Sequence, residues 1–373
     1  MQSWRNIHFA RKGPLAEAFL AYPMSRPPLY PMLLWAGARF GLAPSAVNGL
    51  LQVLLVLGIA VAVREGCGER LAVSAAAAYG LAHFAAVNLH QVTAEGLFAP
   101  LLLLLAMALS RYLASGGRIF LLLVAATCAA LCVTRLFALY FALPAALGGV
   151  LLLAPLPPRR RWAHAATVLA LSSAPIAFWM YAAHARTGFW TGDDRSVERA
   201  FSGENEELAE LTTLGANLRL TAETLIVDFF SPTRYAAHAV VARPYAPSAI
   251  ECAMLALLGI ALVVLARAWA SSPRGPTPLG ASSASVTAAL ALAYLVATIV
   301  IWSLGNNDPI YTRFLFPAYP LLLLSGFEAY AWLAARAERR RDLIPFRVLF
   351  AGFLAIQLAR QLWVKPLPAR FLG

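Results

Sequence analysis

Long apolar runs, separated by short polar or basic segments, dominate the pattern of this chain. The runs lie at 47–63, 71–89, 96–113, 119–154, 163–183, 249–266, 285–304, 313–335 and 344–362. A transmembrane helix needs roughly 20 apolar residues, and these runs are too long for the strands of a membrane barrel. The pattern therefore predicts an all-α, polytopic integral membrane protein with about nine or ten transmembrane helices.

The run 119–154 is too long for a single crossing, and Thr134-Arg135 falls near its middle. An arginine at mid-membrane is costly, so two shorter helices are the cheaper arrangement. We expect a tight hairpin with Arg135 at its mouth.

The first 46 residues contain no complete span. Within them, Arg26-Pro27-Pro28-Leu29-Tyr30-Pro31 forms a proline corner, since each proline fixes φ and removes a backbone donor. Such a segment does not fit inside a spanning helix, but Pro31 suits a first helical position. The following run, 29–42, is too short to cross and contains Arg39, so we expect it to lie along the membrane interface.

A long polar segment at 186–248 interrupts the apolar runs. Inside it, Leu208, Leu211, Leu214 and Leu218 recur at helical spacing, which predicts an amphipathic helix within a water-exposed loop. The chain then divides into four parts: 1–46 as an outer-face segment, 47–185 and 249–373 as transmembrane helices, and 186–248 as a periplasmic loop.

Composition agrees with the membrane interpretation. The chain is 60% hydrophobic and 13% charged, with a mean hydropathy of +0.68, whereas soluble domains carry about 25% charged residues. The net charge is +12, but the basic residues cluster between apolar runs, and no soluble basic domain is available to bind nucleic acid. The four cysteines form no CxxC pair, and Cys128 and Cys132 lie one helical turn apart in an apolar run, so packing is the expected role.

The arginines also predict the sidedness of the chain. Segments rich in arginine alternate with segments that are not, and the positive-inside rule places the first group in the cytoplasm. They are 64–70, 111–118, 158–161, 267–274 and 336–341. Residues 1–46 then lie outside, although a short basic terminus resists translocation. Either the first helix inserts with its N-terminus outside, or, as we expect, a further span precedes the chain as given.

Three arginines, Arg26, Arg135 and Arg313, fall on the predicted outer side. The guanidinium fork binds two phosphate oxygens and is always charged, so the set is suited to a phosphate. Nearby carboxylates and aromatic rings suit an acceptor hydroxyl and a sugar or lipid. No spacing of His, Asp and Glu indicates a metal site, and we expect no cofactor.

Four motifs, in this order, resemble those of GT-C membrane glycosyltransferases related to protein O-mannosyltransferases and aminoarabinose transferases. The proline corner and the residues after it are similar to the first-loop signature of that family. Thr93-Ala94-Glu95-Gly96-Leu97-Phe98 and Thr134-Arg135 are similar to its later motifs. The segment 311–320, YTRFLFPAYP, resembles the entry to a late span, with Phe314 in place of the usual tyrosine.

The resemblance implies a GT-C-like fold and a polyprenyl-phosphate-linked sugar as donor. The sugar would pass to a lipid, glycan or protein acceptor on the periplasmic face of a bacterial inner membrane, in contact with membrane lipids. Arg26, Arg135 and Arg313 would hold the donor phosphate and stabilise it as a leaving group, while Tyr30, Glu95 and Tyr311 would line the cavity. Some members of the fold use a divalent metal.

The chain departs from the family at its catalytic aspartate, which precedes the proline corner in those enzymes. Here residues 1–25 contain no Asp, and Glu17 is the single carboxylate among them. Glu17 is therefore the candidate base, and an inactive GT-C-like fragment or scaffold is an alternative. A polyprenyl-lipid transporter is another, although it predicts charges within spans and inverted halves around broken helices, and the runs show few such charges.

Each candidate also has a plain structural interpretation. Arg26 suits lipid headgroups, and Tyr30 suits an aromatic belt. Glu95 suits a helix N-terminus. Arg135 suits a hairpin, and Arg313 suits a flanking anchor.

Overall fold

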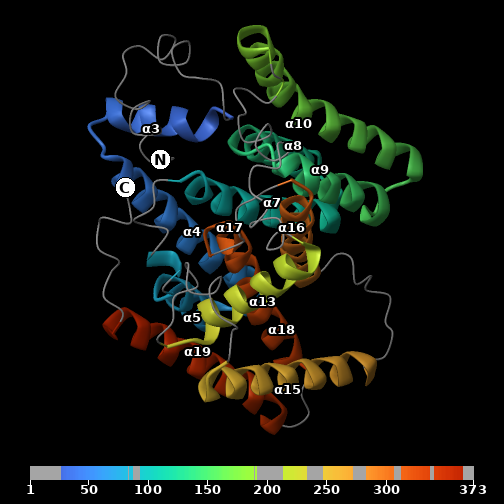
Figure 1. Cartoon of the computed structure of the whole chain (residues 1–373). Coiled ribbons are helices and arrows are strands. Elements are labelled where there is room, and N and C mark those ends of the chain that lie inside the picture. Colours follow the sequence, from blue (N-terminus) through green and yellow to red (C-terminus); the bar gives the residue numbers. More distant parts are fainter. Residues whose placement is uncertain are drawn as a thin grey trace.

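The computed structural model describes residues 27–82, 84–86, 93–188, 190, 213–232, 247–271, 283–305, 312–336 and 340–363. All regular structure in these ranges is helical (Figure 1). Five helices are long and apolar enough to cross a membrane, at Pro44–Cys67, Glu95–Ser115, Pro158–Ala185, Ala249–Ala268 and Arg341–Gln361. The chain is thus an all-α protein with the helices of a membrane protein, and the larger count of nine or ten spans stays a prediction.

The helices follow one another in this order. They are α3 (Leu29–Arg39), α4 (Pro44–Cys67), α5 (Glu69–Gly80), α7 (Glu95–Ser115), α8 (Arg118–Thr134), α9 (Ala138–Gly148) with the π-turn η1 (Gly149–Leu153), α10 (Pro158–Thr187), α13 (Leu214–Phe230), α15 (Ala249–Ser271), α16 (Ser283–Gly305), α17 (Thr312–Leu315), the 3-10 turn η4 (Phe316–Ala318), α18 (Tyr319–Ala334), the 3-10 turn η5 (Arg340–Leu343) and α19 (Ile344–Trp363).

Helix α7 lies at the centre of the bundle and is the most buried of the five candidate spans. It packs against α4, α8 and α16 and against the turn η4. Helices α8, α9 and α10 gather on one side of it, while α15 and α19 lie on the far side of α13 and α18 (Figure 1). Both ends of α7 are therefore surrounded by other helices.

The two ends of α7 define two ends of the bundle. At the Glu95 end, α7 begins beside the start of α4 and the end of α8. At the Arg111 end, Arg111 forms an ion pair with Glu65 of α4, and the hydroxyl of Tyr112 lies 2.9 Å from Nδ1 of His164 in α10. The basic segments 64–70, 111–118 and 158–161 lie at the Arg111 end, so the positive-inside rule makes this the expected cytoplasmic end.

The hairpin predicted at Arg135 is present. Helix α8 ends at Thr134, Arg135 is extended at φ −150° and ψ 128°, and α9 begins at Ala138. The first arm is fixed to α10 because Oγ of Ser172 donates to the carbonyl of Ala125 at 3.0 Å. The long apolar run is therefore broken at its arginine, and Arg135 is kept out of the middle of a helix.

The proline corner leads directly into α3. The helix begins at Leu29, so Pro31 lies in the first turn rather than at the first position, where its missing N–H still has no intrahelical acceptor to lose. Tyr30 and Leu34 are buried against Val47, Leu51 and Leu97. With 11 residues, α3 is about 16 Å long, which is too short to cross a bilayer, and its place at the interface stays a prediction.

Two expected spans are shorter in the structure. The span expected at 71–89 is α5, which ends at Gly80; the chain then turns so that Phe84 packs against Tyr319, with ring centroids 4.7 Å apart. The span expected at 313–335 is divided, because Pro317 and Pro320 lack backbone donors at the junction of α17, η4 and α18. Neither segment is a single long helix.

The amphipathic helix expected in 186–248 is also different. Helix α13 is present, but Leu214 and Leu218 are 53% and 50% exposed, and Leu208 and Leu211 lie outside the described residues. The polar side of α13 faces inward instead, burying Asn217, Thr221, Glu223, Thr224 and Asp228. These polar groups have partners inside the bundle, such as Ser303, whose Oγ lies 3.0 Å from Nδ2 of Asn217. The amphipathic helix with all four leucines therefore stays a prediction.

Candidate functional site

The structure describes three of the predicted site residues completely, Tyr30, Glu95 and Arg135. Arg313 belongs to α17, of which the backbone is described. Glu17, Arg26 and Tyr311 lie outside the described residues, so their proposed roles stay predictions.

Glu95 and Arg135 form an ion pair at the Glu95 end of the bundle. Nη1 of Arg135 lies 2.5 Å from Oε1 of Glu95, joining the end of α8 to the start of α7. The Glu95 side chain is 1% exposed and that of Arg135 is 21% exposed. Burial strengthens the pair because the surroundings screen it poorly. Glu95 thus fixes an arginine that a ligand at this end can still reach.

Tyr30 joins α3 to the same end. Its hydroxyl donates to Oδ1 of Asn48 at 2.7 Å, and the ring is fully buried. Burial and the nearby charge of Glu95 raise the pKa of Tyr30 well above its usual value. The phenol therefore stays protonated and keeps donating to Asn48 at neutral pH. This hydrogen bond anchors α3 beside the ion pair.

Gly96 allows this close approach of α4 and α7. A Cβ at position 96 would lie 3.0 Å from Oδ1 of Asn48, the oxygen that accepts from Tyr30. We expect Gly96→Ala to destabilise the protein by about 1–3 kcal/mol, because Asn48 must move and weaken that bond. Thermal unfolding of the purified protein in detergent measures the loss.

Gly259→Ala is the matched control for that substitution. Gly259 lies within α15 and has nothing within 4 Å of an added Cβ. An alanine there is expected to be neutral or slightly stabilising because it has the higher helix propensity. Equal midpoints for Gly96→Ala and wild type would contradict the close contact.

Tyr294 of α16 lies between the ion pair and the turn that carries Arg313. Its ring packs edge-on against Phe137 and Phe141, with centroids 5.4 and 5.1 Å apart. Its hydroxyl donates to the carbonyl oxygen of Phe314 at 2.5 Å. It is also close enough to interact electrostatically with Arg135 and Glu95.

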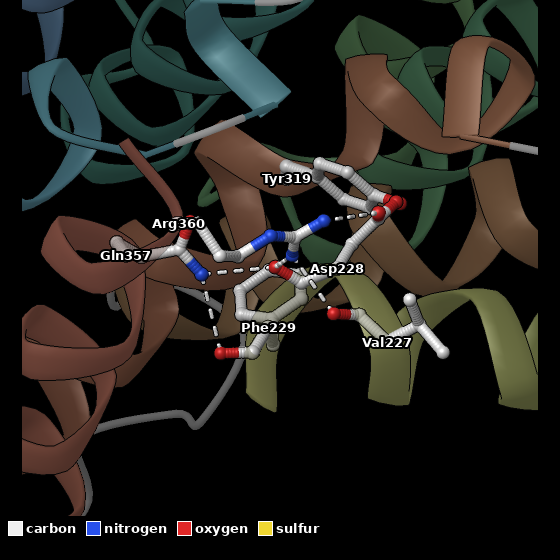
Figure 2. A network of polar contacts seen from close by, with 6 residues as sticks. All are labelled: Val227, Asp228, Phe229, Tyr319, Gln357 and Arg360. Carbon is white, nitrogen blue, oxygen red and sulfur yellow. Dashed lines mark hydrogen bonds and ion pairs between the residues drawn. The ribbon is translucent and has the colours of Figure 1, made fainter. Parts of the chain in front are cut away.

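A second buried ionic network joins α13, α18 and α19. Figure 2 shows Arg360 pointing at the end of α13, where its Nη1 donates to the carbonyls of Val227 and Asp228, each at 2.8 Å. Its Nη2 lies 3.8 Å from Oδ1 of Asp228, and Tyr319 donates its hydroxyl to Oδ2 of the same carboxylate at 2.5 Å. Arg360 and Asp228 are 1% and 4% exposed, so the charges are compensated inside the protein.

Gln357 completes this network one turn before Arg360. Its Nε2 donates to the carbonyls of Asp228 at 2.9 Å and Phe229 at 3.3 Å (Figure 2). Ser231 follows α13 as its C-terminal cap. Carbonyls at the end of a helix lack intrahelical donors, and Arg360 and Gln357 supply donors from α19 to those of Asp228 and Phe229. The Val227 carbonyl accepts from Arg360 and also from the backbone N–H of Ser231.

Sequence reasoning missed this network. Asp228 lies in the segment 186–248 that the sequence predicts to be a water-exposed loop. A carboxylate within the apolar stretch Leu225–Phe230 indicates instead that it is buried with a partner. Arg360 and Glu328 were absorbed into expected spans, and Glu328 is also buried, accepting from Thr287 at 2.9 Å.

Among the described residues, no group of three or more His, Cys, Asp or Glu side chains is placed to hold a metal ion. No protein-family model matches the chain, and comparisons with curated proteins and with solved structures also give no match.

Proposed function

We propose that the protein is a membrane glycosyltransferase of the GT-C type. It would move a sugar from a polyprenyl-phosphate donor to a lipid, glycan or protein acceptor on the periplasmic face of a bacterial inner membrane. The observation that carries the proposal is the partly exposed Arg135, held by buried Glu95 beside the helix that follows the proline corner.

The chemistry asks for a fixed cation where the leaving phosphate gains charge. Arginine meets this need because it stays protonated and donates along two parallel bonds. A guanidinium already held at one nitrogen loses little further freedom when phosphate binds, so it stabilises the departing oxyanion efficiently. Arg135 has this arrangement through Glu95.

One arginine paired with a carboxylate adds no net charge, so the donor phosphate needs further cations. Arg26 in the proline corner and Arg313 in α17 are our candidates. The start of α3 and the turn after Arg313 both approach this end of the bundle, through the Tyr30–Asn48 and Tyr294–Phe314 hydrogen bonds. Glu17 stays the candidate base for the acceptor.

Sugar transfer in membranes tests this function directly. Membranes that contain the protein are supplied with a panel of labelled polyprenyl-phosphate hexoses and pentoses, and label in lipid, glycan and protein fractions is measured. We expect transfer from at least one donor and none in membranes without the protein. Arg111→Ala is the control, because its ion pair lies at the opposite end and both partners are about half-exposed. An active donor that is used equally without the protein would contradict the proposal.

A polyprenyl-lipid transporter is a second candidate, favoured by the buried Asp228–Arg360 pair. Ionisable residues within membrane segments often mark transport pathways. Movement of a fluorescent polyprenyl phosphate across proteoliposomes, without any acceptor, tests it. Transbilayer movement without sugar transfer would favour the transporter.

A further inference from the structure

We propose that Tyr294 is a positioning residue that sets the distance between Arg135 and Arg313 around the donor phosphate. This rests on the proposed function, because it assigns a role within the donor site. It adds a residue that no motif contains and a physical reason for the spacing of the two arginines.

The first observation is how Tyr294 contacts the Arg135 hairpin. Phe137 lies two residues after Arg135, and its ring meets that of Tyr294 edge to face at 78°, while Phe141 meets it at 90°. Edge-to-face aromatic pairs have a preferred geometry, so they define a position as well as fill space. The ring of Tyr294 therefore holds the mouth of the Arg135 hairpin in one position.

The second observation is the hydroxyl of the same residue. It donates to the carbonyl of Phe314, the residue directly after Arg313, in a fully buried hydrogen bond. The other end of this turn is held by Tyr319, whose hydroxyl donates to Asp228. The segment that carries Arg313 is therefore fixed at two points, and one of them is Tyr294.

Together these contacts place one rigid side chain between the Arg135 hairpin and the backbone of α17. The ring fixes the hairpin of Arg135, and the hydroxyl, at the far end of that ring, fixes the backbone beside Arg313. Phosphate binding by two guanidinium groups requires both at the correct separation, because each bidentate contact needs its two N–H···O bonds aligned. Removing the hydroxyl alone releases the Arg313 turn while leaving the aromatic packing in place.

The test compares the affinity for polyprenyl phosphate with that for the uncharged polyprenol. Both lipids are titrated into the full-length protein in detergent, and the ratio of the two dissociation constants isolates the contribution of the phosphate. We expect wild type to prefer the phosphate and Tyr294→Phe to lose about tenfold of that preference, which is the size of one weakened charge-assisted hydrogen bond. Polyprenol binding stays near wild type, while the thermal midpoint falls modestly because the buried Phe314 carbonyl loses this donor.

Tyr112→Phe is the matched control. Tyr112 is equally buried, and its hydroxyl pairs with His164 at the Arg111 end, so its removal leaves the preference unchanged. Phe137→Leu is a second variant that removes the ring contact and keeps the hydroxyl; it is expected to lower the preference as well, and serves if Tyr294→Phe fails to fold.

The outcomes separate the inference from the function. A wild-type preference for phosphate that survives in Tyr294→Phe, or in Phe137→Leu if that is the folded variant, overturns the positioning role and leaves the function standing. Equal binding of both lipids by wild type overturns both. An equal loss in Tyr112→Phe also overturns the inference, because the effect would then be a general result of losing a buried hydroxyl.

Discussion

Replacing Arg360 with methionine is expected to destabilise the protein by about 3–5 kcal/mol. The substitution leaves the Asp228 carboxylate buried without its guanidinium and removes the donors to the carbonyls of Val227 and Asp228. Methionine fills a similar volume, so the loss reports on charge and hydrogen bonding rather than on a cavity. Thermal unfolding and denaturant titration in detergent measure it.

Two further variants define the cause. Arg347→Met, on the same helix, removes an exposed arginine with one long hydrogen bond to Tyr330 at 3.3 Å, and its effect is expected to stay within about 0.5 kcal/mol. Adding Asp228→Asn to Arg360→Met removes the unpaired charge and is expected to recover part of the stability. A double variant no more stable than Arg360→Met would contradict the ion-pair explanation.

Arg135→Ala is expected to lower sugar transfer at least 100-fold, because it removes the cation that would stabilise the leaving phosphate. The same change leaves buried Glu95 without this partner, so it also destabilises the protein. The loss of activity alone is therefore ambiguous. Transfer is measured at equal amounts of folded protein, as judged by gel filtration.

The double variant Arg135→Ala with Glu95→Gln separates the two effects. Neutral glutamine tolerates the absence of a cation, so stability should return towards wild type while transfer stays low. Arg135→Lys keeps the charge but not the fork, and is expected to retain partial transfer. Near-normal transfer in the double variant would show that Arg135 serves the fold alone.

The sequence predicts local features of this molecule better than its contacts. The helix after the proline corner and the break at Arg135 follow from chemistry within a few residues, and both are present. The end of α5 does not, because it depends on where Phe84 packs. The break before α18 has a local signal in Pro317 and Pro320, which the expectation of one span at 313–335 overlooked.

The candidate site shows the same division. Tyr30, Glu95 and Arg135 were each identified from motifs, but the pairing of Glu95 with Arg135 joins residues 40 positions apart. Asp228 and Arg360 are 132 positions apart, and the residues around each give no indication that the two are partners. A charged residue within an apolar stretch indicates that it is paired, but the sequence does not identify the partner, which depends on the fold.

The distance between Asp228 and Arg360 along the chain also orders events during synthesis. Helix α13 leaves the ribosome long before α19, so the Asp228 carboxylate has no contact with Arg360 until α19 is made. Two side chains contact this carboxylate in Figure 2, Tyr319 from α18 and Arg360 from α19, and the contact with Arg360 can form only after α19 is made. Arrival of α19 and formation of this ion pair thus become a single step, and a nascent chain that stalls before α19 carries an acid whose arginine has not yet been made.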